Sequence, residues 1–286
     1  MPTALIVFIA LTIAGFLIHL LCMRLLAWRG VTVRRTRYGV TFIFDTEDAD
    51  GTPVRMLNVN GAFQSVAYAT DELWSELPVS YQREQARIIS ELPCLRRVAV
   101  VGGGGFSMPK WLVDHLPPVR VSVAEIDPKI VEIARESFGL DRLEREHGED
   151  GRFELAVEDG WSWLKSQEEG FDLIINEAFS GSKPLGPLTG EEGVRVVRDH
   201  LCEGGTYLAT LRLPLEGRKA RPLEETCDAF AAGFAHVWLI PEAAKEPTKP
   251  GNNTLVASDV DLVATGCERL AGFEWHAGFG WRGGAR

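Results

Sequence analysis

The sequence predicts an α/β fold built on a mostly parallel sheet, and three observations support that prediction. Residues 98–128 run from an apolar strand through four glycines and a helical pattern into a second apolar strand. From residue 97 onward, strand patterns alternate with helical patterns, which is typical of a parallel sheet covered on both faces. Glu125 ends the second strand about 20 residues after the glycines, at the spacing of a ribose-binding acid. Together these features predict a Rossmann-like domain that binds a nucleoside.

The first residues form an apolar run that is long enough to cross a membrane. Residues 1–23 contain no Asp, Glu, Lys or Arg, and residues 4–21 are almost wholly apolar. Five arginines follow this run, namely Arg24, Arg29, Arg34, Arg35 and Arg37. Because positive charge stays on the cytoplasmic side, we expect one transmembrane helix within residues 1–28, with the N-terminus outside and the soluble part in the cytoplasm. A cleaved signal peptide is the alternative, although a basic n-region and a small-residue cleavage site before Trp28 are missing.

A β-rich stretch follows the apolar run. Four segments carry alternating or β-branched patterns, at residues 31–37, 40–45, 54–59 and 62–69. The sequences DADGT and NG between them have the chemistry of hairpin turns. We therefore expect a small antiparallel β domain over residues 31–70.

The remaining chain is expected to form the Rossmann-like domain, at residues 80–275. An amphipathic helix at residues 80–92 is closed by Pro93. Further strands are expected at residues 153–157, 171–176, 205–213, 236–240 and 254–258, and helices at residues 126–138, 159–166, 190–200 and 223–234. Residues 242–253 are expected to form an exposed loop, and residues 276–286 a flexible tail.

Charge and cysteine usage exclude some partners. The net charge of −10 argues against a nucleic-acid partner, because binding the phosphate backbone requires a basic surface. The five cysteines are scattered, and no pair has metal-ligand spacing. We therefore expect no metal site, and we interpret the cysteines as reduced structural thiols.

Four strand ends carry the candidate site, since ligands of open parallel sheets bind beyond the carboxyl ends of the strands. The residues at these ends are Gly102, Gly103, Gly104, Gly105, Glu125, Glu158, Asp159, Asn176 and Glu177. Glu125 is suited to accept hydrogen bonds from ribose hydroxyls, and Asp159 from an adenine amino group. The alternatives are a solvated strand-end acid for Glu125 and a helix N-cap for Asp159. Asp127 is expected to be a helix N-cap.

At these residues the chain resembles the spermidine/spermine synthase family of aminopropyltransferases, which are relatives of the class I methyltransferases. The resemblance covers about residues 55–258 and rests on the order and spacing of several loose matches. The matching segments are NGAFQS (60–65), SYQRE (80–84), VVGGGG (100–105), VAEIDP (123–128), VEDGWSWL (157–164), FDLIINEAF (171–179), PLGP (184–187) and CEGGTYLA (202–209). NEAFSG followed by PLGPLTGEE further resembles a divergent branch in which this domain accompanies membrane helices.

The resemblance implies a fold, a donor and a set of contacts. The fold is a class I methyltransferase-type sheet with a small N-terminal β domain. The donor is decarboxylated S-adenosylmethionine, the acceptor is an amine, and the assembly is a homodimer. By position, the implied donor contacts are Gln64, Tyr81, Gln82, Glu125 and Asp159, beside the glycines 102–104.

Two positions depart from the family pattern. The family's glycine run ends in an aspartate that holds the donor's amine, and this chain has Gly105 there. The family's aspartate before P-x-G-P, which deprotonates the attacking amine, corresponds to Lys183, or to Ser180 in an alignment without a gap. Because an ammonium nucleophile must lose a proton before it attacks, Glu177 becomes the candidate catalytic base. Its alternative role is to orient the loop that follows it.

The departures leave three functions open. The first is a membrane-anchored, spermidine synthase-like transferase, in which polyamine synthesis is expected to be weak or absent. The second is an S-adenosylmethionine-dependent methyltransferase, since the same nucleoside site serves both donors. The third is a catalytically silent nucleoside-binding or scaffold domain tethered to a membrane.

Overall fold

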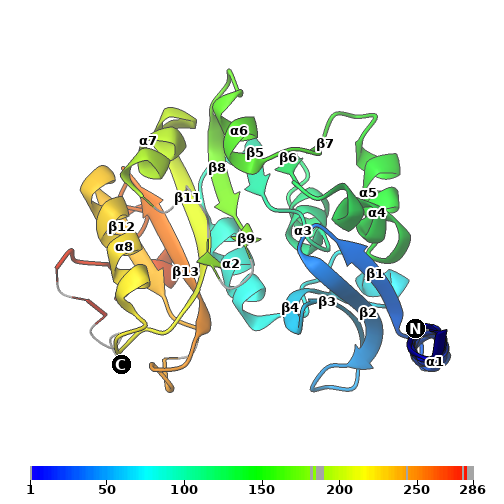
Figure 1. The fold of residues 1–286 in the computed structure, drawn as a ribbon. Helices are drawn as coiled ribbons and strands as arrows, with labels where there is room; N and C mark the ends of the chain where they lie inside the picture. Colours follow the sequence, from blue (N-terminus) through cyan, green and yellow to red (C-terminus); the bar gives the residue numbers. More distant parts are fainter. Residues whose placement is uncertain (1, 181–182, 185–189, 243, 279, 282–286) are drawn as a thin grey trace.

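A computed structural model of the chain describes residues 2–180, 183–184, 190–242, 244–278 and 280–281. A long N-terminal helix precedes a four-stranded antiparallel sheet and a seven-stranded mixed sheet with helices on both faces (Figure 1). This architecture confirms the fold class that the sequence predicts.

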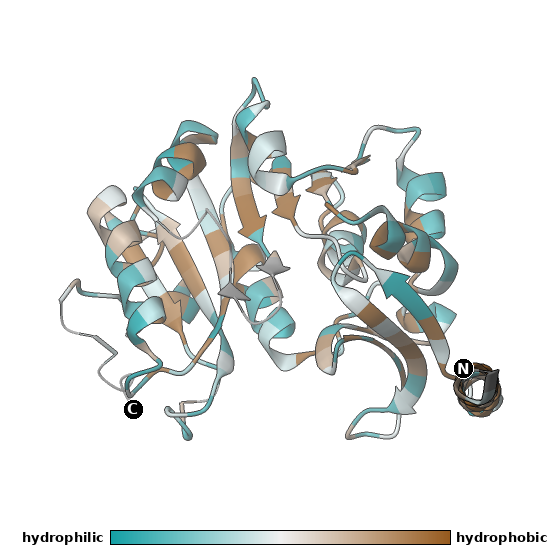
Figure 2. Ribbon diagram, viewed as in Figure 1, coloured by the Kyte–Doolittle hydropathy of each residue, from teal (hydrophilic) through white to brown (hydrophobic). Residues whose placement is uncertain are grey.

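The N-terminal helix α1 (Pro2–Trp28) lies outside the rest of the structure. The helix is apolar on all sides (Figure 2). The mean hydropathy of its most apolar part is 2.7, and none of that part is buried against the rest of the chain. Its length and composition suit a membrane span, and a signal sequence shares both properties. The helix ends in a Schellman motif, in which Gly30 N–H bonds to Ala27 O and Val31 N–H to Leu26 O, at 3.0 and 2.9 Å. Gly30 has a φ of 73°, which favours glycine.

The small sheet is a meander of four antiparallel strands. They are β1 (Thr32–Thr36), β2 (Gly39–Glu47), β3 (Pro53–Val59) and β4 (Ala62–Tyr68). Asn60 and Gly61 both have positive φ, as the expected tight hairpin turn requires. Leu57 pairs with Ser65 whereas Asn58 pairs with Phe63, so Gln64 is the extra residue of a β-bulge.

The large sheet has the strand order β12-β13-β11-β8-β5-β6-β7, parallel except at β13. Its strands are β5 (Arg97–Val101), β6 (Arg120–Ala124), β7 (Phe153–Ala156), β8 (Phe171–Asn176), β11 (Leu201–Leu213), β12 (His236–Ile240) and β13 (Gly251–Ser258). The apolar runs of β5 and β8 lie at its centre (Figure 2), where both faces are covered.

Helices cover this sheet with two hydrophobic cores. The helices are α2 (Ser80–Glu91), α3 (Ser107–His115), α4 (Pro128–Ser137), α5 (Leu140–His147), α6 (Gly160–Lys165), α7 (Glu191–Asp199) and α8 (Arg221–Gly233). Ile88, Leu112 and Val131 lie in one core, whereas Leu164 and Phe230 lie in the other. The short strands β9 (Phe179–Ser180) and β10 (Lys183–Pro184) pair with each other, and two 3-10 turns lie at Asp71–Leu73 and Glu268–Leu270.

Two expectations differ from the structure. The sequence analysis did not predict helix α5. Most of its residues, LDRLEREH, are charged, and only Leu140 and Leu143 are buried. The expected loop at residues 242–253 ends early, because β13 begins at Gly251. Pairing with β11 outweighs the turn chemistry of this segment, and the Asn253 side chain donates to the carbonyls of Leu211 and Leu213. Parts of the expected tail, residues 279 and 282–286, lie outside the described residues.

Asp127 joins the small sheet to the large domain. Its Oδ1 accepts from Lys129 N–H at 2.9 Å and caps α4, as the sequence predicts. Its Oδ2 accepts from Arg37 N–H at 2.6 Å, in the turn between β1 and β2. The side chain is almost fully buried. One carboxylate therefore positions the start of α4 and the tip of the first hairpin.

We expect Asp127→Ala to destabilise the fold by about 1–3 kcal/mol, because it removes a helix cap and a second charge-assisted hydrogen bond. Urea unfolding of the full chain in detergent, followed by tryptophan fluorescence, measures the change. Asp159→Ala is the matched control, since it removes only an exposed cap from α6. An Asp127→Ala variant as stable as this control would contradict the double role.

Candidate functional site

The glycine loop after β5 packs backbone to backbone against the end of β8. Gly102 has a φ of 95°, and a Cβ placed on it would lie 2.9 Å from the backbone nitrogen of Ala178 and from the carbonyl carbon of Glu177. Any side chain at this position would push the two strand ends apart. This close approach places Gly102, at the start of the loop, beside the backbone of Glu177.

Glu125 holds the glycine loop in place. Its Oε2 accepts from Gly103 N–H at 2.9 Å and Gly104 N–H at 3.2 Å, and its Oε1 accepts from Asp127 N–H at 2.9 Å. The residue is only 7% exposed, so the alternative of a solvated strand-end acid is wrong. A carboxylate has about four acceptor positions, which leaves one for a ribose hydroxyl.

Asp159 begins α6, after the end of β7. Its Oδ1 accepts from Ser162 N–H at 3.0 Å and from Ser162 Oγ at 3.1 Å, so the helix-capping alternative is present. The residue is exposed, and so is Glu158 before it. Contact between Asp159 and an adenine remains a prediction.

Tyr38 lies near the candidate site, and the sequence analysis did not include it. It lies in the turn between β1 and β2, next to the Arg37 amide that binds Asp127. Burial raises the pKa of Tyr38, and the charges of Glu125, Asp127 and Asp159 add to the rise. The phenol therefore lies near the acids of the proposed nucleoside site. The sequence could not show this, because it depends on how the two sheets dock.

Strand β4 contacts the other side of the glycine loop. Ser65 Oγ accepts from Gly105 N–H at 2.8 Å, and Ser107 Oγ donates to Val66 O at 3.0 Å. Gln64 precedes Ser65 in the bulge and is half-buried. The structure thus places the predicted donor contact Gln64 next in sequence to a residue that binds the loop.

Close packing surrounds Gly105, the position at which the family resemblance implies an aspartate. A Cβ there would lie 3.0 Å from both Phe138 Cδ1 and Ser65 Cβ, which is tighter than nearly all such contacts. Phe138 is buried, and its carbonyl accepts from Lys110 Nζ at 2.9 Å. Burial lowers the pKa of Lys110 to about 8. A side chain at Gly105 would therefore require Phe138 or Ser65 to shift by a few tenths of an ångström.

Glu177 sits at the end of β8 within a network of neutral donors. Its Oε2 accepts from Gln82 Nε2 and its Oε1 from Thr210 Oγ1, each at 3.2 Å. Gln85 Nε2 in turn donates to Thr210 Oγ1 at 2.8 Å and to Thr254 Oγ1 at 3.3 Å. Helix α2 thus supplies the Gln82 amide, and the sheet supplies the Thr210 hydroxyl, to one carboxylate, while Gln85 orients that hydroxyl.

This environment disfavours the charge on Glu177. Burial raises the pKa of Glu177, and the hydrogen bonds from Gln82 and Thr210 reduce that rise. Burial also raises the pKa of Tyr81 well above its usual value, with Glu177 and Glu242 adding to the effect. A carboxylate with a raised pKa is better matched to accepting a proton near neutral pH than an ordinary glutamate.

Glu242 is a second carboxylate near Tyr81 that the sequence analysis missed. Its Oε2 accepts from the backbone and side-chain amides of Asn252, at 2.6 and 3.0 Å, and its Oε1 from Ser80 Oγ at 3.4 Å. It lies in the segment that the sequence presented only as an exposed loop. The residues on either side of Tyr81 therefore bond to carboxylates at the ends of β8 and β12: Ser80 to Glu242 and Gln82 to Glu177.

The loop after Glu177 is described only in part. Ser180 and Lys183, the two positions aligned with the family's second aspartate, pair through their backbones in β9 and β10. Residues 185–187 of the PLGP segment lie outside the described residues. Within the described part of the chain, no group of three or more His, Cys, Asp or Glu residues could hold a metal ion.

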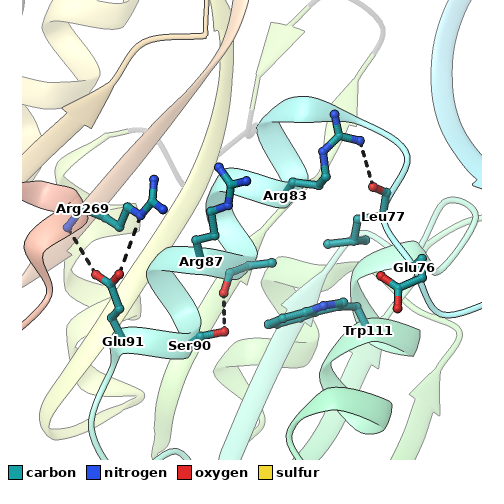
Figure 3. A pocket seen from close by; sticks show the side chains of 9 residues that line it. Glu76, Leu77, Arg83, Arg87, Ser90, Glu91, Trp111 and Arg269 are labelled. Atoms are coloured by element: carbon teal, nitrogen blue, oxygen red, sulfur yellow. Dashed lines mark hydrogen bonds and ion pairs between the residues drawn. The ribbon is translucent and has the colours of Figure 1, made fainter. Parts of the chain in front are cut away.

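A groove of about 350 Å³ lies on another side of α2 and includes none of the predicted site residues (Figure 3). Arg83, Arg87 and Arg269 contribute its positive charge. Arg269 pairs with Glu84 and Glu91, Arg87 pairs with Glu84, and Arg83 donates to the carbonyl of Leu77. These arginines are thus occupied by partners within the chain.

The strand order, the glycine loop and the strand-end acids define a Rossmann-like domain of the class I methyltransferase type. The model of the spermine/spermidine synthase domain matches residues 88–241, which is more than half of the chain. The chain therefore belongs to the spermine/spermidine synthase family, as the resemblance implies.

Individual relatives agree with this assignment. A polyamine aminopropyltransferase of Pseudomonas aeruginosa is 32% identical over 154 residues, covering 52% of this chain and 50% of that protein. The structure of a probable spermidine synthase from Corynebacterium glutamicum superposes with a TM-score of 0.66 at 22% identity, covering 80% of both chains. A spermidine synthase in complex with the transition-state analogue AdoDATO gives a TM-score of 0.57 at 18% identity, covering 82% of this chain and 74% of that one. The matches span about half the length of the curated relatives.

We expect Glu177→Gln to change how stability depends on pH. Because the folded-state pKa of Glu177 is raised, the folded chain binds more protons than the unfolded chain between the ordinary and the raised pKa. The parent chain therefore loses stability relative to Glu177→Gln as pH rises from about 4 toward 7. Thermal unfolding of both chains across this range measures the difference. Parallel curves would show that Glu177 titrates normally.

Proposed function

We propose that this chain is a membrane-anchored transferase of the spermidine synthase type, whose donor is decarboxylated S-adenosylmethionine and whose acceptor is an amine. The observation that carries the proposal is the position of the Glu177 carboxylate at the end of β8, next to Gly102, where it accepts hydrogen bonds from Gln82 and Thr210. Burial raises the pKa of this carboxyl, which suits a proton acceptor. Family membership and the kinship to aminopropyltransferases support the same reaction class.

In this proposal the donor lies across the carboxyl ends of β5, β6 and β7. Its proposed contacts are Gln64, Tyr81, Gln82, Gly102, Gly103, Gly104, Glu125 and Asp159. Glu125 accepts a hydrogen bond from a ribose hydroxyl, and Asp159 accepts one from the adenine amino group. Tyr38 closes the site from the small sheet. Support comes from the charges of Glu125 and Asp159, which both act on Tyr38.

The proposed reaction is a nucleophilic displacement. The nitrogen of the acceptor attacks the propyl carbon bonded to the donor's sulfonium sulfur, a C–N bond forms, and the C–S bond breaks. The bonding electrons stay on sulfur, and methylthioadenosine leaves. Glu177 accepts the proton that the acceptor's ammonium must lose before the attack. Glu242, beside Tyr81, offers a second negative charge to a cationic acceptor.

The proposal also concerns the organisation of the chain. We place a single-pass anchor at residues 1–28 with its N-terminus outside, a β domain at 31–70, the catalytic domain at 80–275 and a tail at 276–286. The exposed, apolar α1 supports the anchor. The order of motifs in residues 176–192 supports the branch of the family that accompanies membrane helices. A homodimer is proposed from family resemblance.

The test is to incubate the full chain in detergent with decarboxylated S-adenosylmethionine and putrescine, and to follow release of methylthioadenosine. Gly105 offers no carboxylate to hold the donor's amine, so we expect turnover far below about 1 s⁻¹. Glu177→Gln should remove what activity there is, whereas Glu177→Asp should retain a part. Activity that survives in Glu177→Gln would exclude Glu177 as the base.

A methyltransferase is the second candidate, and the packing at Gly105 favours it. Without the amine-holding aspartate, the site has less reason to prefer the decarboxylated donor over S-adenosylmethionine. Calorimetry with both donors and methylthioadenosine separates the possibilities. Tighter binding of S-adenosylmethionine supports a methyltransferase, and binding of none of the three supports a silent scaffold.

We expect Glu125→Gln to weaken methylthioadenosine binding by roughly tenfold or more, since a hydrogen bond to a charged group contributes about 1.5–3 kcal/mol. The glutamine side chain has the same size, but it cannot accept hydrogen bonds from Gly103 N–H, Gly104 N–H and a ribose hydroxyl at once. Calorimetry on the folded variant measures the change. Glu154→Gln, an exposed position on β7, is the matched control. Equal affinities in the two variants would refute the role of Glu125.

A further inference from the structure

The register of β1–β4 divides their side chains between two faces. Arg34 pairs with Glu136 of α4 at 3.4 Å, and Arg55 donates to the carbonyl of Ser137 at 2.9 Å. Side chains alternate between the two faces of a sheet, so the residues on the same face as Arg34 and Arg55 point toward the large domain. The alternate residues face away from it, and we call their surface the outer face.

The outer face carries many apolar side chains, and none of them belongs to either hydrophobic core. Its strand positions are Val33, Arg35, Val40, Phe42, Phe44, Thr46, Val54, Met56, Asn58, Phe63, Val66 and Tyr68. On this face Val54 and Asn58 of β3 are buried, whereas Phe63 is 57% exposed and Val40 is 44% exposed. Its other apolar side chains on β2, β3 and β4 are partly exposed: Phe42, Phe44, Met56 and Val66. Apolar side chains gathered on one exposed sheet face are typical of an interaction site.

The position of α1 relative to this sheet indicates what covers the outer face. The Schellman motif at Gly30 fixes the direction in which the chain leaves α1, and β1 begins two residues later. Figure 1 looks along the axis of α1, and β1 and β2 present their broad faces in the same view. A membrane crossed by α1 therefore runs roughly parallel to the small sheet.

Charge and an aromatic side chain point to the same surface. Arg35 is the one charged residue among the strand positions of the outer face, whereas Arg34, Asp45, Glu47 and Arg55 face the large domain. Arg24 and Arg29 flank the end of α1, where Trp28 is 81% exposed. Exposed tryptophan and arginine at a helix end are typical of the membrane interface. Arg35 therefore lies at the end of the outer face that carries Val40, whereas Asp48 and Asp50 lie in the β2–β3 turn at the other end, near Tyr68.

We propose that the outer face of β1–β4 docks onto the headgroup region of an anionic lipid bilayer. This inference rests on the proposed anchor, because α1 orients the sheet. Phe63 and Val40 enter the interface, and Arg35 binds lipid phosphate or carboxylate groups. The docked sheet also positions Tyr38, which lies in the turn that ends β1. The donor site is then held at a fixed orientation to the membrane surface.

The experiment uses the full chain, with the exposed cysteines Cys22, Cys94 and Cys202 replaced by serine. Phe63→Cys carries a fluorophore, and the protein is placed in nanodiscs that contain phosphatidylglycerol and nitroxide-labelled lipid. Glu136→Cys is the matched control, because it is half-exposed on α4, on the other side of the sheet. We expect several-fold stronger quenching at Phe63 than at Glu136, and weaker quenching at Phe63 when phosphatidylcholine replaces phosphatidylglycerol.

The outcomes separate docking from anchoring. Equal quenching at both positions, in a chain that floats with liposomes through an alkaline wash, overturns docking and leaves the anchor intact. A chain that the wash releases overturns both proposals. Contact between fluorophores of two copies at Phe63, without lipid quenching, assigns the face to a second copy and also overturns docking. Val40→Cys repeats the measurement at a second position of the outer face.

Discussion

The carboxylate of Glu125 is the point on which the candidate site depends. It accepts hydrogen bonds from the backbone amides of Gly103, Gly104 and Asp127, and these bonds hold the glycine loop at the end of β6. Asp127 then binds the first turn of α4 through Lys129 N–H and the tip of the first hairpin through Arg37 N–H. Two acids that are separated by a single residue therefore link the glycine loop to the first hairpin, beside the contacts that Ser65 and Val66 make with the loop and α3. The arrangement of strand ends, loop and hairpin follows from this short segment.

Much of this arrangement is visible in the sequence. The apolar runs of β5 and β8 predict central strands, because a buried parallel strand must be apolar on both sides. Glycines and strand-end acids predict the position of the loop. Tyr38, Ser65 and Glu242 could not be found in this way. Each reaches the site through the docking of separate elements, and no local pattern encodes that docking.

The environment of Glu177 shows how one acid differs from another at the same sheet edge. Glu125 is held by backbone amides, whereas Glu177 is held by neutral side chains from α2 and β11, where burial disfavours its charge. The difference agrees with the roles proposed for them: one acid organises a binding loop, and the other exchanges a proton. The sequence identified both acids, but their contrasting surroundings required the fold.

The packing around Gly105 ties this position to two separate parts of the fold. A side chain there would meet Phe138, at the end of α4, and Ser65 of β4. Lys110 of α3 in turn holds the Phe138 carbonyl. A substitution at Gly105 would therefore require these neighbours to shift by a few tenths of an ångström, and the effect would reach the contact between the small sheet and the large domain.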